Sequence, residues 1–186
     1  MSEAAELRLD ACAGHSDRLE AHACRGACHR FRGRPRQNVA RVAVHEASAA
    51  VVFAVADGES GAAEACHAAV EHLLSLLPQD RPLDFESVAY YVTEQLARSV
   101  TTLVAGVVQP DVDGPYVQLF RIGDSGAWLL DRATGACHAL FEPLPHVSES
   151  VDSVAEHLTA SEVLLVAISP IVPTTVCCAD PHCACQ

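Results

Sequence analysis

The sequence contains no lysine, so its 12 basic side chains are all arginine. Aspartate and glutamate together number 24, and the formal net charge is −12 at pH 7. An excess of negative charge on this scale argues against general binding to nucleic acid. The absence of lysine, together with the many alanines, is typical of a GC-rich bacterial genome.

Long apolar runs are also missing. The longest one, residues 47–56, has about half the length needed to cross a bilayer. The first residues, MSEAAELRLD, are acidic and lack the hydrophobic segment of a secretion signal. The 186 residues are 50% hydrophobic, enough for one domain with a buried core. We therefore expect a soluble, cytoplasmic protein that contacts neither membrane nor nucleic acid.

Cysteine, by contrast, is abundant, with nine residues in the chain. Reduced thiols are expected in the absence of a secretion signal. Cys66 and Cys137 lie in apolar patterns and are predicted to be small core residues. For the Cys-rich segment at the C-terminus we prefer an unstructured tail to a zinc or copper(I) site, because the spacing matches no zinc-finger pattern. The candidate ligands there are Cys177, Cys178, His182, Cys183 and Cys185.

The pattern of apolar residues predicts the first elements. Strands are expected at 38–44 and at 50–56, and the second is apolar on both faces, as in a central buried strand. Apolar stripes predict helices over 61–77 and 84–100, the latter with Asp84 as its N-cap. The first 23 residues show no clear period and are predicted to be loop or a loosely held strand.

After residue 99 the pattern changes to β-rich runs at 100–108, 116–123, 126–132 and 137–141. The segments between them, QPDVDGP, GDSG and ATG, are typical of turns in antiparallel hairpins. Residues 148–158 predict a short helix capped by Ser148 or Ser150, and residues 161–168 predict one more buried strand. This order of elements indicates an α+β fold, with helices packed on a mostly antiparallel sheet.

Two acidic residues follow buried strands. Asp57 comes directly after VVFAVA and is followed by Gly58, and Asp124 lies in GDSG after YVQLFRI. A strand end is rigid, and a glycine there lets a backbone carbonyl approach a ligand closely. Carboxylate and carbonyl oxygens are the hard ligands that Mg²⁺ and Mn²⁺ prefer. Asp-Gly is also a common turn, so each position alone is a weak indication.

Five segments in order carry a resemblance to a known family: GRPRQNVARVAV, VVFAVADGESG, SVTTLVAGVV, FRIGDSGAWLLDRATG and SEVLLVAIS. Together they resemble the PPM-type (type 2C) metal-dependent protein serine/threonine phosphatases, more narrowly their bacterial branch. The resemblance covers residues 24–168 and implies an incomplete four-layer αββα sandwich, with residues 1–23 as an N-terminal extension and 169–186 as a Cys-rich tail.

The activity implied by the resemblance is hydrolysis of phosphoserine and phosphothreonine in a phosphorylated protein. Two ions of Mn²⁺ or Mg²⁺ between the sheets would activate a water molecule and steady the phosphoryl charge. On that template Asp57 bridges the two ions, the Gly58 carbonyl binds one of them, and Asp124 serves an accessory metal position.

The sequence departs from the family at the metal ligands. Asn38 and Ser169 stand where the family has aspartates, and its closing Asp-Asn motif has no match, so the chain resembles a degenerate, C-terminally truncated member. Two divalent ions about 4 Å apart repel by on the order of 17 kcal/mol at an effective dielectric of about 20, which a ring of carboxylates normally offsets. We therefore expect at most a weak or single-site cation and weakened or absent catalysis.

The family's phosphate-binding arginine has no unambiguous match. Arg34 and Arg36 lie near its position, in an arginine-rich segment (residues 24–41) that would attract anions. On spacing alone a solvated loop that balances nearby carboxylates is the simpler interpretation of this segment. The two residues are therefore named as phosphate-binding candidates from the resemblance only.

Two explanations of the lost ligands stay open. The protein is either a pseudophosphatase that binds a phosphoprotein or another partner as a regulatory module, or the product of a reading-frame shift after about residue 167. The abrupt change to a Cys-rich tail favours the shift, which cannot account for Asn38. A metal- or thiol-binding role confined to the last ten residues is a third interpretation.

Overall fold

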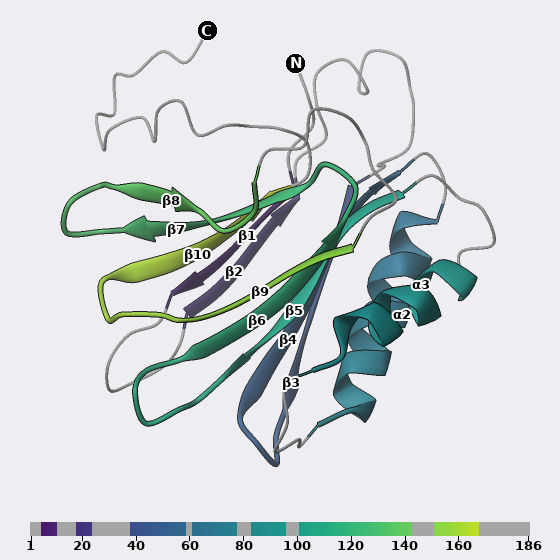
Figure 1. Ribbon diagram of the computed structural model, residues 1–186, viewed down its shortest axis with the longest axis horizontal. Helices are drawn as coiled ribbons and strands as arrows, with labels where there is room; N and C mark the ends of the chain where they lie inside the picture. Colours follow the sequence, from purple (N-terminus) through teal and green to yellow (C-terminus); the bar gives the residue numbers. More distant parts are fainter. Residues whose placement is uncertain are drawn as a thin grey trace, which may run out of the picture.

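The structure is a computed structural model that describes residues 5–10, 18–23, 38–58, 61–77, 83–95, 101–142 and 151–167. These residues form two five-stranded antiparallel sheets and two helices (Figure 1). In the first sheet the order is β3-β4-β5-β6-β9, with bounds Asn38–His45, Ala50–Gly58, Thr101–Gln109, Tyr116–Ile122 and Val151–His157. In the second sheet it is β2-β1-β10-β7-β8, with bounds Arg18–Ala23, Ala5–Asp10, Glu162–Ala167, Gly126–Asp131 and Cys137–Ala139.

The helices α2 (Ala62–Ser75) and α3 (Phe85–Gln95) cover one face of the first sheet, as Figure 1 shows. The other face of that sheet packs against the second sheet through a separate apolar cluster. The described residues thus form three layers of an αββα sandwich: helices, sheet, sheet. The predicted α+β fold with helices on an antiparallel sheet is confirmed.

Strand β4 lies at the centre of this arrangement because it is apolar on both faces. Val52, Ala54 and Ala56 point to the helices, whereas Phe53 and Val55 point into the space between the sheets. All five side chains are fully buried. The alternation follows from the two-residue period of a strand and confirms the predicted central position.

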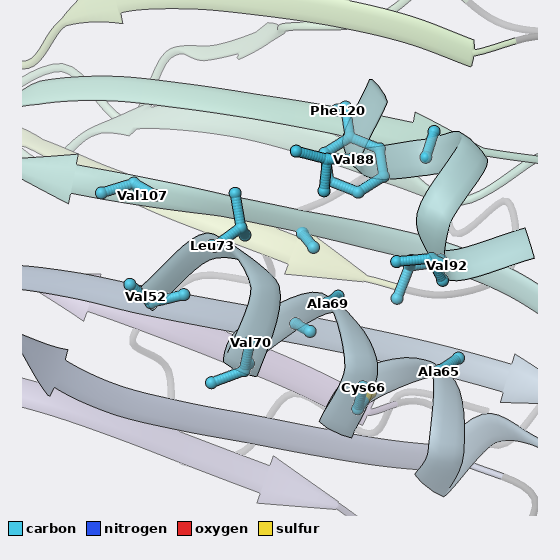
Figure 2. Packing of buried hydrophobic residues seen from close by; sticks show 14 of the residues in the cluster. Val52, Ala65, Cys66, Ala69, Val70, Leu73, Val88, Val92, Val107 and Phe120 are labelled. Atoms are coloured by element: carbon cyan, nitrogen blue, oxygen red, sulfur yellow. The ribbon is translucent and has the colours of Figure 1, made fainter. Parts of the chain in front are cut away.

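The helix predicted over 61–77 is α2, and its apolar stripe is the face that contacts the sheet. Figure 2 shows Cys66, Ala69 and Leu73 of α2 in one apolar layer with residues of α3 and the sheet. Small alanines on this face let the helix lie close to the strands. Full burial of a leucine such as Leu73 contributes about 1.5–3 kcal/mol to folding.

Helix α3 begins as predicted, with Asp84 as its N-cap. The backbone amide of Ser87 donates to Asp84 Oδ1 (3.2 Å), and the Ser87 hydroxyl donates to Oδ2 (2.6 Å). These bonds hold the pKa of the Asp84 carboxyl below its usual value. They satisfy part of the free backbone donors at the helix start. The first residue, Phe85, then packs on Phe120 of the sheet, with 5.3 Å between ring centroids.

Residues 151–157 form strand β9, so the prediction of a short helix over 148–158 is wrong where the structure describes it. Side chains alternate between exposed and half-buried along β9, and Val154 packs against the cluster between the sheets. Pairing with β6 satisfies backbone groups that would otherwise be left at an open sheet edge. The gain from pairing outweighs the local helical preference.

The GDSG segment, residues 123–126, is also not the hairpin turn that was predicted. Strands β6 and β7 lie in different sheets, so this segment carries the chain from one sheet to the other. The other two turn predictions are confirmed, since residues 110–115 join the antiparallel pair β5 and β6, and residues 132–136 join β7 and β8.

Other predictions have mixed outcomes. Cys66 is buried as predicted, but Cys137 is exposed, because β8 has only three residues, all of them exposed. Within the first 23 residues the structure describes two strands, of which β1 pairs with both β2 and β10. Neither of the described helices has the length and apolar character required to span a membrane.

Candidate functional site

The strand register brings the candidate site residues to one end of the first sheet. Asn38 of β3 is the register partner of Asp57 in β4, and Asp57 is also the partner of Thr102 in β5. The next strand, β6, ends one residue before Gly123, whose backbone lies against the Thr102 side chain. Three segments that are far apart in the sequence, around residues 38, 57 and 123, are therefore neighbours across the sheet end.

Asp57 lies on the face of β4 that is turned to the second sheet. It shares the strand alternation of Phe53 and Val55, which are fully buried between the sheets. Asp57 itself is half-buried, as is Gly58, the last residue of the strand. A carboxylate at the end of a fully buried strand is held in place by the packing below it. The predicted location of Asp57 is confirmed, while its role as a metal ligand stays a prediction.

The GDSG segment adds a compact turn beside Thr102. Gly123 has φ +84°, and a Cβ atom there would lie 2.8 Å from Thr102 Cγ2, so glycine is required on both counts. Ser125 is fully buried, and its hydroxyl donates to Thr102 Oγ1 (2.9 Å). The half-buried Asp124 lies between these two anchored residues.

The second glycine of the turn leaves room for an aromatic ring. The Trp128 ring lies across Gly126, where a Cβ atom would come within 2.3 Å of the indole. Gly126 also begins β7 and pairs with Ala167 at the end of β10. The aromatic residue that follows GDS in the sequence therefore packs on the turn, and the ends of both sheets meet here.

Arg121 is a residue of this region that the sequence analysis missed. Its side chain is only 4% exposed and lies beside the turn. Nε and Nη2 contact Asp152 Oδ2 of β9 at 2.8 and 2.7 Å. Nη2 also donates to the Glu142 carbonyl (2.6 Å), Nη1 donates to the Ser125 carbonyl (3.4 Å), and the guanidinium lies over the Phe141 ring at 4.8 Å. The available signal was one charged residue in the otherwise uncharged strand YVQLFRI.

Cys66 lies close to this region in the chain fold but is not a candidate nucleophile. Its Sγ donates to the backbone carbonyl of Val39, the residue after Asn38 (3.4 Å). Burial raises the pKa of the Cys66 thiol to about 12, despite the opposing effect of the Arg41 charge. The thiol is therefore neutral at physiological pH, and only a thiolate would be a strong nucleophile.

The remaining predicted site residues lie outside the described residues. These are Ser169, which follows β10 by two positions, the phosphate-binding candidates Arg34 and Arg36, and the cysteines and histidine of the tail. Their roles stay predictions.

The residues that the structure describes do not fit a pair of divalent metal ions. No three or more His, Cys, Asp or Glu side chains of this part of the chain are grouped as a metal would require. The register partner of Asp57 is the uncharged Asn38. A carboxylate and the Gly58 carbonyl offer hard oxygen donors, but a single charge offsets little of the repulsion between two divalent ions.

No protein-family model and no curated protein matches the sequence. Among solved structures, the phosphatase domain of the cell fate determinant SpoIIE from Bacillus subtilis, in a crystal form without domain swapping, aligns with a TM-score of 0.49 and 13% identity over 87% of this chain. The chain spans 64% of the length of that structure.

Two further solved structures align less well. A variant of a bacterial serine phosphatase gives a TM-score of 0.44 and 8% identity, over 70% of this chain and 90% of its own. The PP2C phosphatase domain of SpoIIE with a fragment of its regulatory domain gives 0.45 and 11% identity, over 87% and 44%. TM-scores this low do not establish a family.

Proposed function

We propose that this chain is a divergent PPM-type protein phosphatase domain, in which metal-dependent hydrolysis of phosphoserine and phosphothreonine is strongly weakened. The observation that carries the proposal is the strand register. It brings Asp57, with its following glycine, and the GDSG turn to one end of two packed sheets, the arrangement that the resemblance of the sequence implies.

The chemistry of this end supports a phosphate ester as substrate. A half-buried carboxylate and a strand-end carbonyl can hold one Mn²⁺ or Mg²⁺, weakly, and that ion would supply positive charge for a phosphoryl group. Arg34 and Arg36 are the proposed phosphate-binding residues, and Ser169 the position of the lost carboxylate. The proposed partner is a phosphorylated protein in the cytoplasm of a bacterium.

The test is hydrolysis of p-nitrophenyl phosphate by the full chain with and without Mn²⁺. We expect slow, Mn²⁺-dependent turnover that Asp57→Asn lowers by about 100-fold or more, because Asp57 would help to hold the ion, whose charge would be worth several kcal/mol to such a reaction. Asp113→Asn is the matched control, since Asp113 is exposed in the turn at the opposite end of the sheet. Turnover that Asp57→Asn leaves intact would contradict the proposed site.

A gain-of-function variant tests the same assignment in the other direction. Asn38→Asp places a second carboxylate beside Asp57 in the register and should tighten Mn²⁺ binding by about tenfold or more, measured by calorimetry. Unchanged affinity would mean that residue 38 does not face the cation. Val112→Asp is the control for overall charge, because it adds a carboxylate to the exposed turn at the opposite end of the sheet.

A pseudophosphatase is the second candidate, favoured by the uncharged Asn38 beside Asp57 and by the lack of a three-ligand group among the described residues. Such a protein would bind a phosphoserine peptide without hydrolysing it. Peptide binding with no turnover above that of heat-denatured protein would favour this candidate. Rapid Mn²⁺-dependent release of phosphate would exclude it.

A further inference from the structure

Arg121 is a buried arginine between the two sheets. It shares the strand alternation of Val117 and Leu119, which are buried between the sheets. Its side chain is 4% exposed, yet it carries a full positive charge, because arginine is not deprotonated in proteins. A buried charge is tolerated only where it is paired and its donors are satisfied. Arg121 is therefore held in place by its partners, and they by it.

The partners of Arg121 belong to three separate segments. Asp152 is on the edge strand β9, Glu142 follows strand β8 of the second sheet, and Ser125 is in the GDSG turn. The two carbonyl oxygens, of Glu142 and Ser125, lie where the chain leaves regular sheet pairing. The planar guanidinium with its fixed fork of donors can serve all three acceptors at once, whereas an ammonium group has no such geometry.

We propose that Arg121 is a positioning residue that fixes the GDSG turn relative to Asp57. The Ser125 carbonyl accepts from Arg121, and the Ser125 hydroxyl donates to Thr102, the register partner of Asp57. Arg121 thus acts on the candidate site through Ser125. The functional meaning of the turn rests on the proposed phosphatase function, but the fixation of the turn is measured without it.

Hydrogen exchange in the turn is the direct readout. The Ser125 carbonyl and the Gly126 amide belong to one peptide plane, so losing the bond from Arg121 frees that plane. In Arg121→Lys, which keeps the charge, we expect exchange at residues 123–126 to be about tenfold faster, with a fall in the unfolding temperature smaller than that of Arg121→Met. Amides in the centres of β4 and β5 should be unchanged.

Two further variants complete the experiment. Arg121→Met should also accelerate exchange in the turn and lower the unfolding temperature, since it removes the charge that faces Asp152. Arg41→Met is the control, because Arg41 forms a surface ion pair with Glu71 (3.1 Å), and the turn should exchange as in the wild type. Full protection of the turn in Arg121→Lys, or acceleration in the same proportion throughout the sheets, would overturn the proposal.

Activity separates this inference from the proposed function. If the wild type turns over p-nitrophenyl phosphate, Arg121→Lys should lower kcat with little change in KM, as expected of a buried residue that acts through the turn. If the wild type has no Mn²⁺-dependent turnover, the proposed function fails, and the exchange experiment still decides whether Arg121 fixes the turn.

Discussion

The two ends of the first sheet are built from the same kinds of polar pair but differ in burial. At the turn end, next to residues 123–126, Arg121 pairs with Asp152 at 2.7 Å, and the arginine side chain is 4% exposed. At the hairpin end, next to residues 110–115, His157 pairs with Asp111 at 2.9 Å, and the side chains are 41% and 42% exposed. The two pairs have similar distances but should contribute differently to the free energy of unfolding. Water screens the His157–Asp111 pair, whereas it hardly reaches the Arg121 side chain.

The hydroxyl pairs at the two ends of the sheet differ in burial in the same way. Ser125 donates to Thr102 at the turn end (2.9 Å), with Ser125 fully buried. Thr159 and Ser161 lie 3.3 Å apart at the hairpin end, where both are accessible to solvent. If the hydrogen bond between Thr159 and Ser161 breaks, each hydroxyl can bond to water instead. The buried Ser125 hydroxyl has no water to replace Thr102.

The cause of the difference is the connection that the chain makes at each end. The connections at the hairpin end, residues 110–115 and the β9–β10 crossover at residues 158–161, are largely exposed, so most of their polar groups are accessible to water. In the crossover from β6 to β7, by contrast, Ser125 is fully buried, so its carbonyl needs a donor from within the protein. Buried polar side chains at the turn end thus follow from the burial of this one crossover.

Removal of the carboxylate from each pair should give the largest difference in stability between the two ends. Asp152→Ala leaves the Arg121 charge buried without its partner, and we expect a loss of about 3 kcal/mol in the free energy of unfolding, near the low end for buried pairs because Asp152 is 38% exposed. The matched change at the hairpin end, Asp111→Ala, removes the carboxylate of an exposed pair and should cost much less. Urea unfolding of both variants measures the two losses.

Equal losses for Asp152→Ala and Asp111→Ala would show that water reaches Arg121 after all. The slope of the unfolding free energy with urea should be the same for both variants and the wild type, because neither substitution is expected to alter the surface exposed on unfolding.

The hydroxyl pairs should give a smaller contrast. Ser125→Ala leaves the half-buried Thr102 hydroxyl without its donor, and we expect a loss of about 1–2 kcal/mol. Ser161→Ala at the hairpin end should change stability by about 0.5 kcal/mol or less. Thermal unfolding monitored by circular dichroism is sufficient to distinguish the two. A Ser161→Ala variant as unstable as Ser125→Ala would remove the distinction between the two ends.

The sequence could predict most of the fold because the first sheet and the helices have strong periodicity. The central strand at 50–56, the helical stripe from Ala62 to Leu73 and the Asp84 cap are local patterns that the packing reinforces. It could also predict that Asp57 ends a buried strand, since an abrupt change from apolar residues to Asp-Gly marks that point.

The failures concern features that depend on distant partners. Residues 151–157 have a helical alternative, and only the open edge of β6 makes them a strand. Likewise, GDSG has the residues of a hairpin turn, and no local sequence pattern indicates that β7 joins the other sheet. Arg121 was missed because its hydrogen-bond acceptors come from three separate segments of the chain. The rest of its strand has the pattern of an ordinary apolar strand.

Acid sensitivity should give the smallest effect, and it belongs to the hairpin end. The hydrogen bond from His157 and one from the Val112 amide hold the pKa of the Asp111 carboxyl below its usual value of 3.8. A carboxyl whose pKa is lower in the folded than in the unfolded protein stabilises the fold at any pH above its unfolded-state pKa. This stabilisation is lost as the pH falls through the lower, folded-state pKa.

The unfolding temperature of the wild type should therefore fall more steeply below about pH 4 than that of Asp111→Asn, which has no charge to lose. Above that pH the two proteins should differ by a small, constant amount. The pKa values of Asp84 and Asp131 are lowered in the same direction, so acid sensitivity is reduced in the variant but not abolished. Parallel curves for the two proteins from about pH 6 to about pH 2.5 would mean that the Asp111–His157 pair contributes nothing in solution, which would widen the contrast with the buried Arg121 pair.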